Sequence, residues 1–129
     1  MADHVVLLSV PGLRKDDLSR MRNLATIRGR GSLAQLVPSF PCVTWPVQAN
    51  MLTGVLSDAH GVVGNGFFWR DEGQVEMWTA WNDKIQAPQI WDRLLQHDAE
   101  LTSAVWFPML SKGCGASYVC MPAPVHNPD

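Results

Sequence analysis

Residues 4–10 read HVVLLSV and are closed by Pro11 and Gly12. A continuous apolar and β-branched run that ends in a turn is typical of a strand buried on both faces of a parallel sheet. Residues 16–31, DDLSRMRNLATIRGRG, predict a helix, because two aspartates precede apolar residues at helical spacing and glycines follow them. Residues 32–37, SLAQLV, alternate like a short strand. This order of strand, helix and strand indicates an α/β fold.

The rest of the chain continues to alternate between helical and extended segments. Residues 45–53 predict a helix stopped by Gly54, and residues 87–98, APQIWDRLLQHD, predict an amphipathic helix with Pro88 near its first turn. Strands are expected at residues 74–81, 101–107 and 117–121. We expect residues 5–10 and 101–107 to be adjacent or near-adjacent parallel strands, with a helix at 87–96 on one face of their sheet.

Length and composition describe an ordinary globular domain. The 129 residues are 47% hydrophobic and 17% charged, with a net charge of −2. The most basic stretch, residues 20–32, has no interleaved aromatic residues, so a solvated helix face explains it better than a nucleic-acid patch. We expect one domain over residues 1–129. Because the last segment, PAPVHNPD, ends no obvious element, we also expect this domain to be the N-terminal part of a larger enzyme.

The N-terminal run is too short for a signal peptide, and no stretch approaches the roughly 20 apolar residues of a membrane span. The cysteines are odd in number and lack metal-ligand spacing, which favours free buried thiols in a reducing, cytoplasmic setting; they are Cys42, Cys114 and Cys120. Neither a membrane nor a nucleic acid is therefore expected as a partner.

The segment 38–46, PSFPCVTWP, places three prolines around one threonine. Pro46 fits the first turn of a helix and pushes Trp45 away from helical geometry, so Thr44 is expected at or just before a helix start. Such a site offers unpaired backbone N–H groups to an anion, and a hydroxyl held there can act as a nucleophile. On physical grounds alone, a helix-capping threonine is the alternative.

Three segments in order, VVLLSVPGLR, LVPSFPCVTWPVQANMLTG and DAHGVVGNGFFWRD, together resemble the N-terminal part of the nucleotide pyrophosphatase/phosphodiesterase family, within the alkaline phosphatase superfamily. The resemblance runs over residues 5–71 and continues more weakly through PQIWDRLL and TSAVWFP. It implies an alkaline-phosphatase-like sandwich with a mostly parallel central sheet flanked by helices. It also implies a metal-dependent hydrolase of phosphodiester or pyrophosphate bonds, acting on a small phosphate ester.

The resemblance assigns roles to two residues. Thr44 matches the family's nucleophile, which lies at a helix start beside two zinc ions and is itself a zinc ligand. Asn65 matches the asparagine that donates a hydrogen bond to a phosphoryl oxygen, although on its residues alone it also fits a turn position that tolerates positive φ. Phosphoryl transfer needs such an in-line nucleophile and donors to the non-bridging oxygens.

One position departs from the family pattern. The family's first strand normally ends in a zinc-binding aspartate, whereas this chain has Pro11, which offers no ligand. Asp16 and Asp17 fall in the following helix, and the family's other zinc ligands lie C-terminal of the region that this chain covers. A non-catalytic member that keeps the fold without a complete zinc site is therefore the alternative to a hydrolase. The substrate and the oligomeric state stay open.

Two other reactive side chains have simpler explanations. His60 matches a histidine of the family's HG turn that is not a metal ligand, so we interpret it as structural. Cys42 lies two residues before Thr44, but no histidine stands nearby in sequence to activate it, and we expect a buried packing residue.

Overall fold

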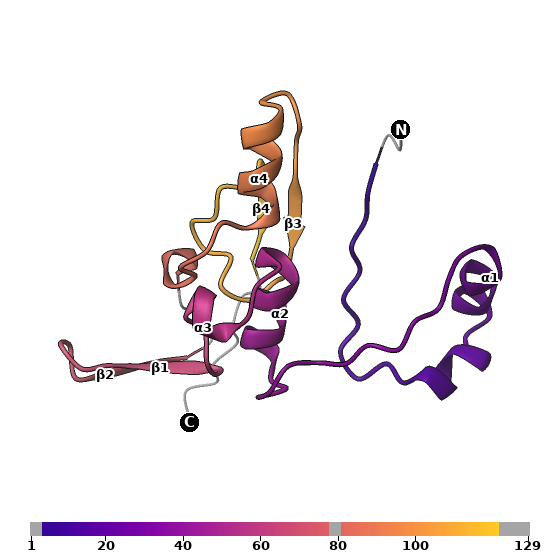
Figure 1. Cartoon of the computed structure of the whole chain (residues 1–129), viewed down its shortest axis with the longest axis horizontal. Coiled ribbons are helices and arrows are strands. Elements are labelled where there is room, and N and C mark those ends of the chain that lie inside the picture. Colours follow the sequence, from indigo (N-terminus) through magenta and orange to yellow (C-terminus); the bar gives the residue numbers. More distant parts are fainter. Residues whose placement is uncertain (1–3, 78–80, 122–129) are drawn as a thin grey trace. The chain divides into compact units, whose positions relative to one another are not determined.

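The computed structural model describes residues 4–77 and 81–121. The chain divides into two compact units, Met1–Leu36 and Val37–Asp129 (Figure 1). In chain order the elements are η1 (Lys15–Ser19), α1 (Arg22–Arg30), α2 (Thr44–Thr53), α3 (Ser57–His60), β1 (Gly66–Trp69), β2 (Gln74–Met77), η2 (Asn82–Lys84), α4 (Ile90–His97), β3 (Ala104–Trp106) and β4 (Tyr118–Cys120).

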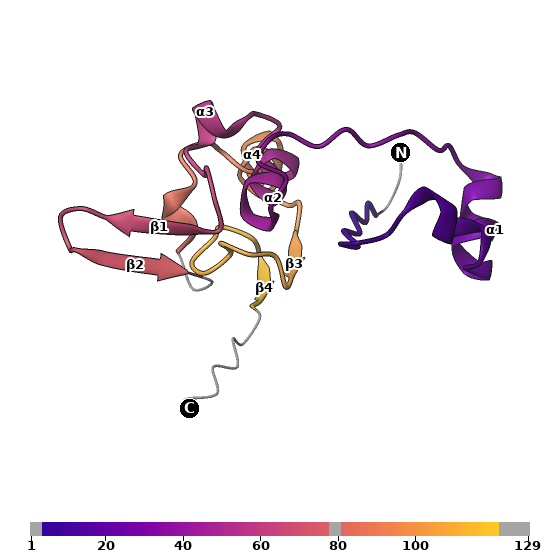
Figure 2. The ribbon, with the colours of Figure 1, turned by 90° about the horizontal axis from the view of Figure 1, so that it is seen from below.

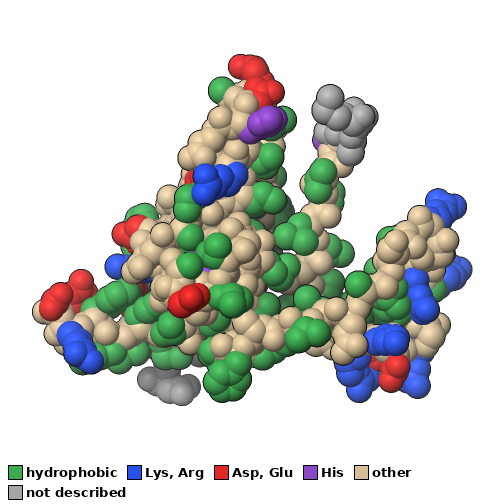
Figure 3. Space-filling model, viewed as in Figure 1, with side chains coloured by type: hydrophobic (Ala, Val, Ile, Leu, Met, Phe, Trp, Pro, Cys, Tyr) green, Lys and Arg blue, Asp and Glu red, His purple; other side chains and the backbone are tan. Residues whose placement is uncertain are grey.

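The first unit contains helix but no strand in its described part. The helix expected at 16–31 is confirmed in two pieces, the 3₁₀ turn η1 and the helix α1. Neither piece has a buried residue, and basic side chains gather over this segment in Figure 3. The solvated basic helix face expected from the sequence is therefore present.

The strands predicted at residues 5–10 and 32–37 are wrong for this structure. Both segments form neither helix nor strand, and Val5 and Val6 are 89% and 86% exposed. A strand needs a neighbour that pairs with its backbone groups, and no segment among the described residues pairs with either run. An apolar, β-branched composition specifies an extended chain, but it does not supply the partner.

In the second unit, the two predicted helices are confirmed. Helix α2 starts at Thr44, one residue before the predicted range, and stops where Gly54 takes a left-handed φ of 74°. Helix α4 starts at Ile90, three residues later than predicted. Pro88 thus lies before the helix and not inside its first turn. The backbone N–H of Gln89 donates to the Asp92 carboxylate at 2.8 Å, which caps this start.

The strands of the second unit form two small sheets. Strands β1 and β2 make an antiparallel hairpin (Figure 2), and β3 and β4 pair in parallel with Val105 opposite Val119. Segments 101–107 and 117–121 are thus confirmed as strand regions, but β3 pairs with β4 and not with residues 5–10. For the strand predicted at 74–81, β2 confirms residues 74–77, while residues 78–80 lie outside the described residues.

The core of the second unit forms where α2 meets the loops that follow it. It consists of Trp45, Ala49, Val62, Ile85 and Leu110, with Phe67 and Met109 packed against it. Trp45 is fully buried and its ring centroid lies 5.7 Å from that of Phe67. Since buried aromatic side chains contribute strongly to packing, this cluster holds the start of α2 in place.

The described residues show helices with two small sheets, which is consistent with an α/β fold; a mostly parallel central sheet flanked by helices is not shown. Among these residues, no helix has both the length and the apolar character needed to cross a membrane. The single domain over 1–129 and the cytoplasmic location stay predictions.

Candidate functional site

Thr44 is the first residue of α2, as the proline pattern predicts. Val43, in extended geometry, occupies the capping position before it. The half-buried Thr44 hydroxyl has no hydrogen-bond partner within the described part of the chain. The alternative interpretation as a capping threonine is therefore wrong for this structure, and the hydroxyl is available for another role.

Asn65 lies against the same helix start. Its side-chain Oδ1 accepts a hydrogen bond from the backbone N–H of Trp45 at 2.9 Å, across twenty residues of chain. Because the oxygen is held in this way, the Nδ2 group is the end of the amide that stays available, and it has no partner among the described residues. The structure thus brings together the two residues that the resemblance selected.

Gly66 explains how the chain passes so close to its neighbours just after Asn65. A Cβ atom at this position would lie 3.0 Å from Cγ of Met77 and 3.3 Å from the backbone oxygen of Glu76. A side chain here would therefore require the facing residues of β2 to shift slightly at the pair of Gly66 with Met77. A glycine after Asn65 therefore suits the close pairing of β1 with β2.

The start of α2 can bind an anion through few but well-placed donors. Pro46 has no N–H, Val47 donates to the carbonyl of Val43, and Trp45 donates to Asn65. This leaves the backbone N–H and the hydroxyl of Thr44 as the uncommitted polar groups of the first turn in the described structure. With the Asn65 amide and the positive end of the helix dipole, they favour a phosphoryl oxygen here.

His60 is fully buried, which agrees with a structural role. Burial lowers its pKa below the ordinary histidine value, outweighing the hydrogen bond to its own backbone and the charge of Asp58, both of which raise it. Its Nε2 lies 2.6 Å from the side-chain amide of Asn50 on α2. Asn50 was not singled out from the sequence; the available signal was an amide in the middle of an apolar helix.

Pro11 lies in a turn of the first unit, where the N–H of Leu13 donates to the carbonyl of Val10 at 3.3 Å. Asp17, the neighbouring acid, is held in an ion pair with Arg14 at 2.9 Å, which lowers the pKa of Asp17. Asp17 is thus engaged locally in η1, in line with its interpretation as a helix residue.

The described residues do not fit a metal centre. No three histidine, cysteine, aspartate or glutamate side chains among them gather into a group that could hold an ion. Cys42 is exposed and not buried as expected, whereas Cys114 and Cys120 are partly buried; all three thiols are free. Cys42 is exposed because it lies in the loop before α2, outside the core cluster.

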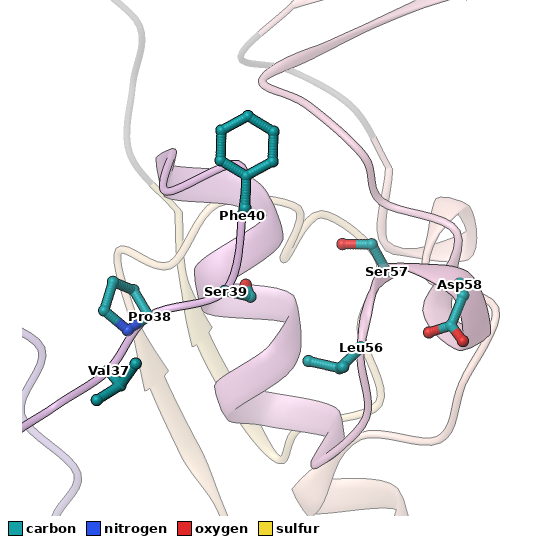
Figure 4. A pocket seen from close by; sticks show the side chains of 7 residues that line it. All are labelled: Val37, Pro38, Ser39, Phe40, Leu56, Ser57 and Asp58. Atoms are coloured by element: carbon teal, nitrogen blue, oxygen red, sulfur yellow. The ribbon is translucent and has the colours of Figure 1, made fainter.

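A shallow pocket of about 460 Å³ opens beside this region but does not include Thr44 (Figure 4). Its lining is mostly apolar, with two hydroxyls and one carboxylate; it consists of Val37, Pro38, Ser39, Phe40, Leu56, Ser57 and Asp58. The carboxylate of Asp58 would repel an anionic phosphate ester. The start of α2, and not this pocket, is the candidate site.

The matches with known proteins are to phosphodiesterases and pyrophosphatases. The family model described as type I phosphodiesterase / nucleotide pyrophosphatase matches residues 5–127. A Schizosaccharomyces pombe protein described as an uncharacterized pyrophosphatase/phosphodiesterase is 37% identical over 67 residues, which are 50% of this chain and 14% of that protein. The chain thus spans a small part of this relative's length. No solved structure matches significantly.

Proposed function

The chain belongs to the type I phosphodiesterase / nucleotide pyrophosphatase family, and on this premise we propose that it supplies the nucleophile, Thr44, for hydrolysis of phosphodiester or pyrophosphate bonds. The observation that supports this most is the start of α2, where the uncommitted Thr44 hydroxyl stands beside the anchored Asn65 amide. The substrate class is a small phosphate ester, in keeping with the hydrolases of this family.

In the proposed reaction, Oγ1 of Thr44 gives up its proton and forms a bond to phosphorus while the bond to the leaving oxygen breaks. The leaving oxygen takes a proton, and a phosphothreonine ester is formed. Water then attacks the phosphorus, the bond to Oγ1 breaks and the hydroxyl is restored. The N–H of Thr44 and Nδ2 of Asn65 donate to the non-bridging oxygens, whose charge grows in the transition state.

Zinc belongs to this proposal only at the level of the family resemblance. Two zinc ions are expected there, and Thr44 is the one described residue that we propose as a ligand. Because the described residues form no group that fits a metal ion, no step above is assigned to the metal.

We further propose that residues 1–129 form the N-terminal part of one catalytic domain with an alkaline-phosphatase-like fold. In that fold the small sheets would belong to a larger, mostly parallel sheet flanked by helices. The family model supports this by matching nearly the whole chain, and the yeast relative supports it by extending far beyond the matched segment.

A non-catalytic family member is the second candidate. Pro11 in place of the family's aspartate favours it. Such a protein would keep the fold and the start of α2 and would turn over no phosphodiester.

The test is turnover of a nitrophenyl phosphodiester by the full-length protein, together with its zinc content and its intact mass during turnover. We expect Thr44→Val to abolish both turnover and the covalent phosphoryl adduct. The matched control is Thr53→Val on the same helix, whose hydroxyl instead donates to the carbonyl of Ala49 at 2.7 Å. It should keep turnover within about threefold, as expected for a site outside the chemistry. Absence of both zinc and turnover in the wild type would favour the non-catalytic candidate, and an unchanged Thr44→Val would exclude Thr44 as the nucleophile.

A further inference from the structure

The loop that carries Asn65 is hydrogen-bonded to α2 at two separate points. At one end, Nε2 of His60 lies 2.6 Å from the side-chain amide of Asn50, in the second half of the helix. At the other end, Asn65 meets the N–H of Trp45 at the helix start. Val62, which lies between the two points, is fully buried in the core with Trp45 and Ala49. The loop therefore runs along α2 from its later turns back to its first residue.

The backbone of this loop is held by the same histidine ring. The N–H of Val62 donates to Nδ1 of His60 at 3.1 Å. Because Nδ1 accepts this bond, a neutral ring carries its proton on Nε2, which lies 2.6 Å from the side-chain amide of Asn50. The carbonyl of His60 also accepts a bond from the N–H of Gln86 at 3.0 Å. Each of these polar groups of His60 is engaged, and the side chain is completely buried.

The chain on the other side of Thr44 joins the same network. The side-chain amide of Asn50 is also hydrogen-bonded to the hydroxyl of Ser39, five residues before Thr44. Asn50 thus links the segment that enters α2 to the ring that holds the loop leaving α3. Both segments that converge on the candidate site depend on one partly buried amide, that of Asn50, and one buried imidazole, that of His60.

We propose that His60 is a positioning residue for the candidate site: its neutral ring fixes the loop that presents the Asn65 amide to the start of α2. This inference rests on the proposed function in one respect: the role of Asn65 as a donor to the phosphoryl group. Its structural content, the coupling of the His60 ring to the contact between Trp45 and Asn65, is measurable without turnover.

Two substitutions separate the roles of the two ring nitrogens. In His60→Asn, the side-chain oxygen can take the place of Nδ1 and keep the bond from the Val62 N–H. In His60→Gln, the amide can reach Asn50 but leaves the buried Val62 N–H without an acceptor. We expect hydrogen exchange at the Trp45 amide to accelerate about tenfold or more in His60→Gln and by less than about threefold in His60→Asn.

A reference amide and a control variant make this measurement specific. The N–H of Phe107 donates to the carbonyl of Cys120 at 2.8 Å, away from the network, and its exchange should change by less than about twofold in every variant. His97→Gln, at an exposed histidine in the last turn of α4, is the matched control and should leave the Trp45 amide unchanged. Acceleration of the Trp45 and Phe107 amides by the same factor in His60→Gln would overturn the proposal, since it would reflect general destabilisation.

A titration of the wild-type chain needs no substitution. Protonation at Nδ1 removes the acceptor of the Val62 N–H, with Asp58 the charged neighbour that favours the protonated ring. In NMR spectra, the Trp45 amide and the Asn65 side-chain amide should shift with the midpoint of the His60 ring signal. Independent midpoints would refute the coupling. If the coupling holds while Thr44→Val keeps turnover, the proposed function fails and this inference stands.

Discussion

At the scale of single residues, the oxygen and the nitrogen of the Asn65 side-chain amide have different roles. Oδ1 accepts from the Trp45 N–H, and Nδ2 is the proposed donor to phosphate. Asn65→Ala should cost about 1–3 kcal/mol in the free energy of unfolding, because it leaves the Trp45 N–H without its acceptor. It should also lower turnover about 10²-fold through loss of one preorganised donor.

Asn65→Asp separates these two effects. The carboxylate keeps an acceptor for the Trp45 N–H and adds a negative charge at a helix start, so denaturant unfolding should show stability at or above that of the wild type. The same charge replaces the donor and repels an anionic ester, so turnover should fall at least as far as in Asn65→Ala. A stable Asn65→Asp with full turnover would contradict the proposed donor role.

The buried His60 makes the stability of the second unit depend on pH. Burial lowers the pKa of His60 in the folded protein, so the unfolded chain binds a proton at higher pH than the folded one does. This contribution is fully present above the ordinary histidine pKa of about 6.5 and is lost as the pH falls through that value toward the lowered folded pKa. Thermal unfolding between pH 7.5 and 5 should show this loss, and His60→Asn should reduce it.

At the scale of elements, the end of α2 depends on one glycine. Gly54 has a φ of 74°, and a Cβ atom there would meet nothing within 4 Å. Gly54→Ala should therefore cost about 1 kcal/mol through backbone strain alone. The matched control is Gly29→Ala within α1, which has no left-handed φ and open space around it; this change should instead stabilise its helix by up to about 1 kcal/mol. Equal effects in denaturant unfolding would contradict the strain argument.

The sequence predicted some elements well because their causes are local. The start of α2, and with it the placement of Thr44, follows from Pro46, and the end of α2 follows from Gly54. The placement of Asn65 near the start of α2 was expected only from the family resemblance, since turn chemistry alone cannot say which surface an amide faces, and its bond from the Trp45 N–H was not predicted. The Asn50–His60 pair was missed because ten residues of helix and loop separate its members, and no local pattern specifies such a pairing.

The strand at residues 5–10 shows where local pattern stops being sufficient. Its apolar run was interpreted as a fully buried strand, yet burial and pairing depend on other segments of the fold. By contrast, β3 was placed correctly within 101–107, while its parallel neighbour proved to be β4. Position along the chain was predictable for β3, but the identity of its partner was not.

At the scale of the whole molecule, large apolar side chains stay on the surface of the described structure. In the β3–β4 sheet, Trp106 is 76% exposed and Tyr118 is 68% exposed, and the two lie on the same face because their strand positions alternate in phase. Parallel pairs are ordinarily covered on both faces, and a two-stranded sheet is marginal by itself. Uncovered aromatic surface of this kind favours association between molecules.

We therefore expect the isolated 129-residue chain to self-associate as its concentration rises. Light scattering coupled to size exclusion should show masses above the 14.3 kDa of one chain, and Trp106→Thr should shift the distribution toward the monomer. Trp91→Phe is the matched control, because Trp91 is 3% exposed and contributes little to the surface, so this variant should associate like the wild type. A monodisperse monomer with a sharp thermal transition would contradict the prediction, since it would mean that the aromatic face of β3 and β4 is already covered within one chain.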